Sequence, residues 1–319
     1  MKLIITGIGG FVAYHFIEYL KSIQSNLEIL GLDIADNIEI NYSKFNYKKI
    51  DLRNYNEVFE ILSEYKPDYI LHLASISSVS KSWTMPLDSF INNTNIFLNI
   101  VESIRQLKLS TRILSIGSSE EYGKYSANQM PLKETDELHP ANPYAIARVS
   151  QEMLSKLYAD EYGLNIVMTR SFNHIGIKQK STFVVASFVE QLINIKTNKQ
   201  TSIKVGNIEI IRDFLDVRDV VEVYYKLLKF GKKGEIYNVC SNRGIKLLDI
   251  IKIISDILNI KPIIEIDKSR IRPDDNMIII GDNSKIKKEF GFTPKYLITE
   301  SLKEIVNEKI EYINEREQI

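Results

Sequence analysis

The sequence predicts an α/β fold, in which a doubly wound parallel sheet is joined to a smaller C-terminal lobe. Five short apolar segments rich in β-branched residues are typical of buried strands: KLIITG, LEILGLD, YILHLAS, RILSIGS and LNIVMTRS. The stretches between them, such as AYHFIEYLKSI and NYNEVFEILSEY, repeat apolar residues at the spacing of a helix. This alternation indicates parallel strands joined by helices that cover the sheet.

The first strand ends in a glycine-rich turn, TGIGGFVAYHF, in which Gly7, Gly10 and Ala13 stand at the start of a helix. Small residues there let the backbone approach a pyrophosphate, and the helix N-terminus supplies free N–H donors. The second strand ends at Asp33, whose carboxylate can accept hydrogen bonds from the hydroxyls of an adenosine ribose. Because the same charge repels a 2′-phosphate, NAD(H) is favoured and NADP(H) is the second choice. Tight packing of the turn is the alternative interpretation.

A third short strand is followed by Asp51 and Leu52, which are expected to border the adenine, although Asp51 could instead be a simple helix cap. The rhythm of strands and helices is clear up to residue 172 and loosens afterwards. Residues 1–172 are therefore expected to form an NAD-binding domain, and residues 173–319 mainly a substrate-binding lobe with segments that return to the sheet. Two polar segments of this half, FNHIGIKQKSTF and SRIRPDDN, are expected to be irregular loops.

Charge and composition limit the kinds of partner. Forty-one basic residues balance forty-one acidic ones, so no overall field favours nucleic acid or an anionic membrane, and a small-molecule partner is expected. The single cysteine, Cys240, cannot form an internal disulfide. There are four histidines, His15, His72, His139 and His174, and they lack the spacing of metal ligands. The N-terminus runs straight into a strand, and no apolar window reaches about 18 residues, so a cytoplasmic location is expected.

Further motifs identify a family resemblance that covers nearly the whole chain: TGIGGF, HLASISSVSKSW, SIGSSEEYG, PYAIAR, RSFNHIG, VGNIEIIRDFLDVRDV, GEIYNVCS and IRPDD. With them the chain resembles the extended short-chain dehydrogenase/reductase superfamily and its nucleotide-sugar branch. The last four motifs are most similar to those of enzymes that act on GDP-sugars, in particular C4 reductases of GDP-4-keto-6-deoxymannose. The resemblance implies a Rossmann-like fold, NAD(P)H-dependent reduction and deoxysugar biosynthesis for cell-surface polysaccharide.

The resemblance also implies roles for individual residues. Tyr144 matches the catalytic tyrosine of the family and Ser118 its catalytic hydroxyl residue, which suits the chemistry because the alkoxide formed at C4 must be stabilised and protonated. A turn pair that caps the next segment is the alternative for Ser118 and Ser119. The residues expected to bind cofactor are Gly7, Gly10, Phe11, Val12, Asp33, Asp51, Leu52, Leu73, Ala74, Ser75, Tyr144 and Arg148.

Arg148 is a departure from the family pattern, which has lysine four residues after the tyrosine. Residues four apart are neighbours on a helix, so the guanidinium is expected beside the Tyr144 phenol. Arginine keeps the positive charge that favours a phenolate, and its donors can reach ribose hydroxyls, but it is bulkier and planar. Arg148 is therefore expected to substitute for the lysine, and loss of activity is the alternative.

The substrate site implied by the resemblance combines residues from both halves of the chain: Ser119, Glu120, Asn173, Val205, Gly206, Asn207, Arg212 and Arg272. Val205, Gly206 and Asn207 are expected beside the guanosine, while Arg212 and Arg272 suit bidentate binding of its diphosphate. Each arginine alone could be a surface ion pair. His174 is expected either near the sugar or as a satisfied structural group. Trp83, Cys240, Tyr224 and Tyr225 are expected to be packing residues.

Three functions stay open at this point. The first is the C4 reductase. The second is a GDP-sugar 4,6-dehydratase or epimerase with retained NAD, because related dehydratases use a glutamate at the position of Glu120 as a catalytic base. The third is a non-catalytic nucleotide-binding scaffold, suggested by Arg148. A homodimer is expected, since NTNIFLNIVESIR and YAIARVSQEMLSKLYADEYG each carry an apolar helical stripe and the matching helices of the superfamily pair across a dimer axis.

Overall fold

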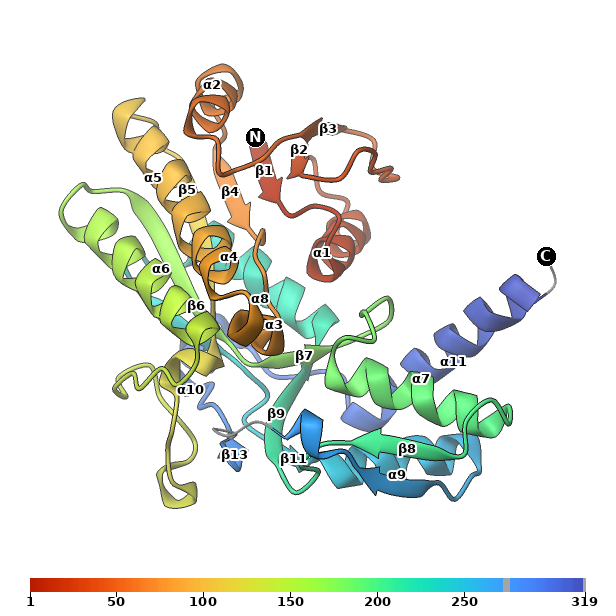
Figure 1. Ribbon diagram of the computed structural model, residues 1–319. Helices are drawn as coiled ribbons and strands as arrows, with labels where there is room; N and C mark the ends of the chain where they lie inside the picture. The colour runs from red at the N-terminus through yellow and green to blue at the C-terminus, as the bar shows by residue number, and fades with distance from the viewer. Residues whose placement is uncertain (272–275, 318–319) are drawn as a thin grey trace.

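The computed structural model describes residues 1–271 and 276–317. Its centre is a seven-stranded sheet in which every neighbouring pair of strands is parallel, in the order β10-β6-β5-β4-β1-β2-β3 (Figure 1). The strands are β1 Lys2–Thr6, β2 Glu28–Asp33, β3 Phe45–Lys49, β4 Tyr69–His72, β5 Arg112–Ser118, β6 Asn165–Ser171 and β10 Ile236–Val239. The five apolar segments identified in the sequence form β1, β2, β4, β5 and β6, and the predicted doubly wound α/β fold is confirmed.

Helices cover both faces of the sheet because successive strand residues point in opposite directions. Leu3 and Ile5 of β1 pack under α1 (Phe11–Ser22) and α8 (Val217–Phe230). Ile4, between them, packs on the opposite face against α2 (Tyr55–Tyr65) and α5 (Ile96–Gln106). The C-terminal part of α6 (Pro143–Asp160) completes this second layer, and α10 (Ser284–Phe290) borders the first.

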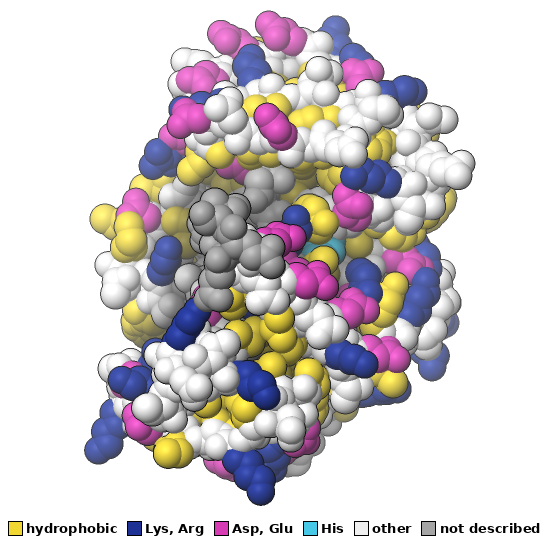
Figure 2. Space-filling model, turned by 90° about the vertical axis from the view of Figure 1, so that its right-hand side faces the viewer, with side chains coloured by type: hydrophobic (Ala, Val, Ile, Leu, Met, Phe, Trp, Pro, Cys, Tyr) yellow, Lys and Arg dark blue, Asp and Glu magenta, His cyan; other side chains and the backbone are white. Residues whose placement is uncertain are grey.

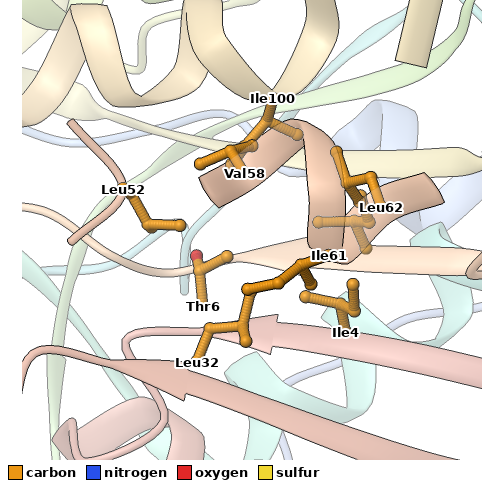
Figure 3. A pocket seen from close by; sticks show the side chains of 9 residues that line it. Ile4, Thr6, Leu32, Leu52, Val58, Ile61, Leu62 and Ile100 are labelled. Atoms are coloured by element: carbon orange, nitrogen blue, oxygen red, sulfur yellow. The ribbon is translucent and has the colours of Figure 1, made fainter. Parts of the chain in front are cut away.

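A small void lies between the sheet and α2, under the strand ends (Figure 3). Its volume is about 10 Å³, and of its nine lining residues only Thr6 is polar. A water molecule needs at least this much space and two or more polar partners. The void is therefore an apolar packing defect of the core. The ends of β1 and β2 pack on the apolar side chains that line it.

The C-terminal lobe is built on two small sheets. β9 (Ile211–Asp216) pairs with β7 (Asn173–Ile175), β11 (Gly244–Lys246) and β13 (Ile278–Ile279), while β8 (Ser202–Val205) pairs with β12 (Ile263–Ile266). Three helices, α7 (Val184–Lys196), α9 (Leu247–Leu258) and α11 (Ile298–Glu317), pack on these strands around a separate apolar core (Figure 1).

The expectation that residues 172–183 form only an irregular loop is wrong at β7. This three-residue strand exists because it pairs with β9, about 40 residues further along the chain, and a strand that depends on a distant partner has no local sequence signal. The first two residues of the second predicted loop, Ser269 and Arg270, belong to a short 3-10 turn, η4 (Lys268–Arg270).

The remaining segments connect these layers. α3 (Val79–Thr84), α4 (Pro86–Phe90) and a π-helical turn, Ile91–Asn95, lead into α5, and the 3-10 turns η2 (Ser119–Tyr122) and η3 (Ala127–Gln129) follow β5. Of the helices in the described ranges, none has the length and apolar character needed to cross a bilayer. On the face drawn in Figure 2, basic and acidic side chains are interspersed, in line with the balanced net charge.

Candidate active site

A cleft of about 1420 Å³ lies where the carboxyl ends of the parallel strands meet the C-terminal lobe. In a doubly wound sheet this edge is where ligands bind, because the strand order reverses there and the loops diverge. All of the site residues predicted from the sequence line this one cleft, apart from Arg272, which lies outside the described residues.

The glycine turn after β1 is formed as the sequence predicts. Gly7 has a φ of +69°, and a Cβ there would lie 2.9 Å from the Cα of Ala74, so only glycine fits. Gly10 is the N-cap of α1 and offers no side chain to the N–H groups of the first turn. These donors and the positive end of the helix face the cleft, which is the arrangement that binds a pyrophosphate.

Asp33 and Asp51 follow the next two strands. The Oδ2 of Asp33 accepts the N–H of Gly9 at 2.9 Å and its Oδ1 accepts the N–H of Ile34 at 2.8 Å, so the carboxylate is fixed beside the glycine turn. Asp51 is paired with Arg53, and this hydrogen bond lowers its pKa. The helix-cap interpretation of Asp51 is wrong, because the side chain that caps α2 belongs to Asn54.

Ser118 ends β5 and opens the turn η2. Its Oγ accepts the N–H of Glu120 at 3.2 Å, and its own N–H donates to Oε1 of Glu121 at 2.6 Å, so the two residues form a capping box. Ser118 therefore caps the following turn, as the alternative to a catalytic role required, and it also lines the cleft. Glu120 lines the cleft too, where its Oε2 accepts a hydrogen bond from Asn142 at 2.9 Å.

Tyr144 lies in the first turn of α6. Asn142 caps this helix by accepting the N–H of Ala145 at 2.8 Å, and Pro143 fits the first helical position because its missing N–H is not needed there. The helix start is thus set by local sequence, and it brings the Tyr144 ring to the cleft together with Ser118. The hydroxyl and the phenol come from different elements that meet at the end of β5.

Arg148 lies one turn further along α6, and its guanidinium carbon is 5.2 Å from the centre of the Tyr144 ring. It is not a surface cation, since only 4% of the residue is exposed. One Nη atom donates to the carbonyl of Ile116 at 3.1 Å and to Oε1 of Gln151 at 2.7 Å, while Nε is buried and has no hydrogen-bond partner among the residues that the structure describes. The positive charge is therefore fixed against the phenol by the protein itself.

The charge of Arg148 also reaches His72 at the end of β4. Burial, and to a lesser extent Arg148, lowers the pKa of His72 to about 3, so this histidine is neutral. Its Nδ1 is 2.9 Å from the Oγ1 of Thr6, which in turn accepts the N–H groups of Leu73 and Ala74. His72 is thus a structural residue that fixes the segment Leu73–Ser75 along the cleft.

The C-terminal lobe supplies the opposite wall. Val205, Gly206 and Asn207 follow β8, and a Cβ on Gly206 would lie 2.7 Å from the carbonyl oxygen of Arg270. An Nη atom of Arg212 donates to the carbonyl of Asn276 at 2.7 Å, so this guanidinium is fixed by backbone at the cleft. His174 stacks on Phe11, with ring centres 6.1 Å apart, and burial lowers its pKa.

Asn173 also lies on this wall, where its Nδ2 donates to the carbonyl of Asp213 at 3.3 Å. Several cleft residues have no strong signal in the sequence: Lys178, Lys180, Lys204, Arg270 and Tyr224. Tyr224 is a packing residue, as expected, since it has no exposed surface and belongs to the core beside the large sheet. The residue also borders the cleft, where its hydroxyl is 2.7 Å from the Oγ of Ser171. The lysines come from segments whose polar character is the only available signal.

Three comparisons place this geometry among known proteins. The family profile described as GDP-mannose 4,6 dehydratase matches residues 4–305. A GDP-6-deoxy-D-mannose reductase from Pseudomonas aeruginosa is 30% identical over 308 residues, which cover 96% of each chain. A GDP-6-deoxy-D-talose 4-dehydrogenase from Aggregatibacter actinomycetemcomitans is 26% identical over 91% of this chain and 92% of its own. A solved structure of RMD from Pseudomonas aeruginosa in complex with NADPH superposes with a TM-score of 0.85 at 28% identity, over 98% of this chain and 99% of that one.

Proposed function

Because the chain belongs to the GDP-mannose 4,6 dehydratase family, we propose that it reduces the C4 ketone of a GDP-4-keto-6-deoxy sugar with NAD(P)H, as in the synthesis of GDP-6-deoxy-D-mannose. The observation that carries the proposal is the meeting of Ser118 and Tyr144 in a cleft that continues to the glycine turn on one side and to Val205–Asn207 on the other. The 30% identical relative named a GDP-6-deoxy-D-mannose reductase supports the choice of reaction.

The residues of the cleft suit each part of this reaction. A bound nicotinamide cofactor supplies the hydride that adds to the ketone carbon. Tyr144 gives its proton to the oxygen that becomes the hydroxyl, and the Ser118 hydroxyl donates a hydrogen bond to the same oxygen. Arg148, fixed against the ring, favours the phenolate that remains until it is reprotonated from solvent. Glu120 and Ser119 hold the sugar from the η2 turn, and Asn173 from the opposite wall.

The residues present fit a dinucleotide. The Gly7 backbone leaves space that a Cβ would fill, and the first turn of α1 has no side-chain cap. Gly10, Phe11 and Val12 would hold the pyrophosphate, Asp33 the adenosine ribose, and Asp51 and Leu52 the adenine. Leu73, Ala74 and Ser75 would border the middle of the cofactor, and Arg148 would lie by its nicotinamide ribose. The carboxylate of Asp33 favours NADH, while the solved relative is in complex with NADPH.

The test is a direct assay with GDP-4-keto-6-deoxymannose and either NADH or NADPH, followed by the absorbance of the reduced nicotinamide. We expect loss of one reduced cofactor for each ketone consumed. No loss of cofactor, combined with conversion of GDP-mannose into a 4-keto product, would replace the reductase with a dehydratase. Cofactor binding with neither reaction would leave a nucleotide-binding scaffold.

The dehydratase is kept as a second candidate because of one specific observation. Glu120 lines the cleft next to Ser118, and Asn142 at the start of α6 fixes its carboxylate. A carboxylate in this place could remove a proton from the sugar. Glu120→Gln separates the two functions, since it should abolish dehydration but leave most of the reduction intact.

We further infer a homodimer from an apolar surface over α3, α4 and α6. On α6, Ile146, Met153 and Leu157 are about half exposed or more and lie on one side of the helix. The neighbouring segment adds Trp83, Met85, Leu87 and Phe90. Trp83 is 49% exposed, so its expected role as a core packing residue is wrong.

The apolar residues of α5, by contrast, are mostly buried against the sheet. Light scattering at micromolar concentration should give twice the mass of one chain. The Met153→Glu variant should give the mass of one chain. A monomer in the unmodified protein would contradict the dimer.

A further inference from the structure

The second glutamate of the η2 turn points away from the cleft into the protein. Glu121 has no exposed surface, and its Oε1 accepts the backbone N–H of Ser118 at 2.6 Å. Gly117 makes this contact feasible, because a Cβ there would lie 2.5 Å from the same oxygen. The carboxyl group is therefore fixed directly behind the residue whose hydroxyl lines the cleft.

Glu121 has its second partner on another element. Its carboxyl group interacts with that of Glu152 on α6, and a hydrogen bond between two carboxyl groups requires a proton between them. In the described part of the chain no N–H or hydroxyl group donates to the buried Oε2 of Glu121, so this oxygen is available to carry the proton.

Glu152 is paired in turn with Arg170 of β6, whose Nη2 and Nε donate at 2.8 and 2.9 Å. The guanidinium of Arg170 also lies over the ring of Tyr122, 4.7 Å from its centre. Three elements, η2, α6 and β6, thus meet in one buried polar cluster made of Glu121, Glu152, Arg170 and Tyr122.

We propose that Glu121 is a positioning residue, which fixes Ser118 relative to helix α6 and therefore to Tyr144. The inference rests on the roles proposed above for Ser118 and Tyr144. Glu152 lies eight residues after Tyr144 on the same helix, about two turns away, so a group bonded to Glu152 is held to the helix that carries the phenol. A hydroxyl and a phenol that act on one oxygen need a fixed separation, because small displacements cost a large part of the rate.

Electrostatics explain why the proton stays on the pair. Burial raises the pKa of Glu121 well above its ordinary range, and the negative charge of Glu152 adds to this, while the Ser118 N–H and Arg170 oppose it. Arg170 brings one positive charge, which Glu152 already neutralises. A second buried carboxylate would have no counter-ion, so the neutral acid is the stable form.

Two substitutions of similar size separate the positioning role from packing. Glu121→Gln keeps an oxygen for the Ser118 N–H and an N–H for Glu152, and we expect kcat within about threefold of the unmodified enzyme. Glu121→Leu removes both bonds and leaves the Ser118 N–H without an acceptor, and we expect kcat to fall about tenfold or more, with the cofactor Kd unchanged. The expected pattern is that kcat is retained in Glu121→Gln and lost in Glu121→Leu.

Glu102→Gln is the matched control. Glu102 of α5 is less buried than Glu121, and it too holds α6, but through Tyr158 at the far end of the helix, at 2.9 Å. Its loss should lower the melting temperature with little change in kcat. Glu121→Leu that binds cofactor and has an unchanged kcat would overturn the proposal. Equal loss in the Gln and Leu variants would also overturn it, because the hydrogen bonds alone would then not account for the effect.

A readout that needs no substrate keeps this test separate from that of the proposed function. An acid whose pKa is raised in the folded state stabilises the fold at low pH, and this contribution is lost as the pH rises through the raised value. The melting temperature of the unmodified protein should therefore fall from acidic to alkaline pH relative to that of Glu121→Gln. Parallel curves would show that no proton is shared with Glu152, even if the reduction is confirmed. Diverging curves in a protein that does not reduce the 4-keto sugar would support the buried pair and reject only the reaction.

Discussion

The two walls of the cleft are built by different means. On the side of the large sheet, the ligand-facing groups are mostly backbone N–H groups and strand ends, fixed by features such as Gly7 and the carboxylate of Asp33. On the side of the C-terminal lobe, side chains such as Arg212 project from short strands whose pairing connects distant parts of the chain. A wall of backbone groups binds the constant part of a ligand, whereas a wall of side chains can change with the substrate. If the two walls are separable in this way, a substitution on one wall should leave the affinity for the ligand of the other wall unchanged.

The largest expected effect lies where the walls meet. Tyr144→Phe removes the proposed proton donor and keeps the ring that Arg148 packs against, so kcat should fall by at least about 10²-fold, while both ligands still bind. Steady-state kinetics and titration of cofactor fluorescence measure the two quantities. Retained turnover would mean that another group protonates the product oxygen.

The next effect should be confined to the backbone wall. Gly7→Ala places a methyl group 2.9 Å from backbone atoms of Ala74 at a φ of +69°, so the turn must distort and cofactor affinity should fall about tenfold or more. Isothermal titration with NADH measures the change.

Gly291→Ala is the control for Gly7→Ala. Gly291 has a similar φ of +64°, but a Cβ there would meet no atom of the described residues within 4 Å, and Gly291 lies outside the cleft. It should lose stability and keep its affinity for cofactor. Equal cofactor affinity in the two variants would show that the glycine turn is not a binding surface.

Arg212→Met tests the side-chain wall. Removal of a positive charge that backbone carbonyls hold at the cleft should raise the KM for the GDP-sugar about tenfold and leave the cofactor Kd unchanged. Lys246→Met is the matched control, because it removes an exposed charge that Glu209 neutralises, on the strand paired with β9. If both variants change KM equally, the effect is one of net charge and not of a phosphate site.

The difference between the walls also explains what the sequence could predict. The backbone wall has local signals: a glycine spacing, an acidic strand end, and the Asn142-Pro143 start of α6. The doubly wound fold follows from the same local periodicity.

The C-terminal lobe was less accessible from local patterns. β7 has no signal without β9, and Lys178 reaches the cleft from a polar loop, where its Nζ lies 4.3 Å from the centre of the Tyr14 ring. Arg212 was found only by resemblance to a family. Tyr224 packs in the core as the sequence predicts, and only the fold shows that its hydroxyl also lies beside Ser171 at the cleft.

A smaller effect is expected at Arg148, where the family pattern has lysine. Arg148→Lys keeps the charge and should retain most of the activity. Arg148→Met removes the positive charge beside the phenol, so kcat should fall about fivefold in steady-state assays. Normal activity in Arg148→Met would show that the guanidinium only fills space between Ile116 and Gln151.

The smallest effect concerns the choice between the two cofactors at the edge of the backbone wall. Asp33→Asn removes one negative charge and keeps an oxygen for the Ile34 N–H, so the ratio of kcat/KM for NADPH to that for NADH should rise about fivefold, as expected for a charge interaction of about 1 kcal/mol near the surface. Asp36→Asn removes an equal charge three residues away, but from an exposed group that Lys49 already neutralises, and should change the ratio by less than about twofold. If both variants shift the ratio equally, the preference arises from the general field and not from contact with the ribose. If neither variant shifts the ratio, Asp33 serves only to hold the glycine turn through Gly9. The backbone wall then does not distinguish a 2′-hydroxyl from a 2′-phosphate on the adenosine ribose.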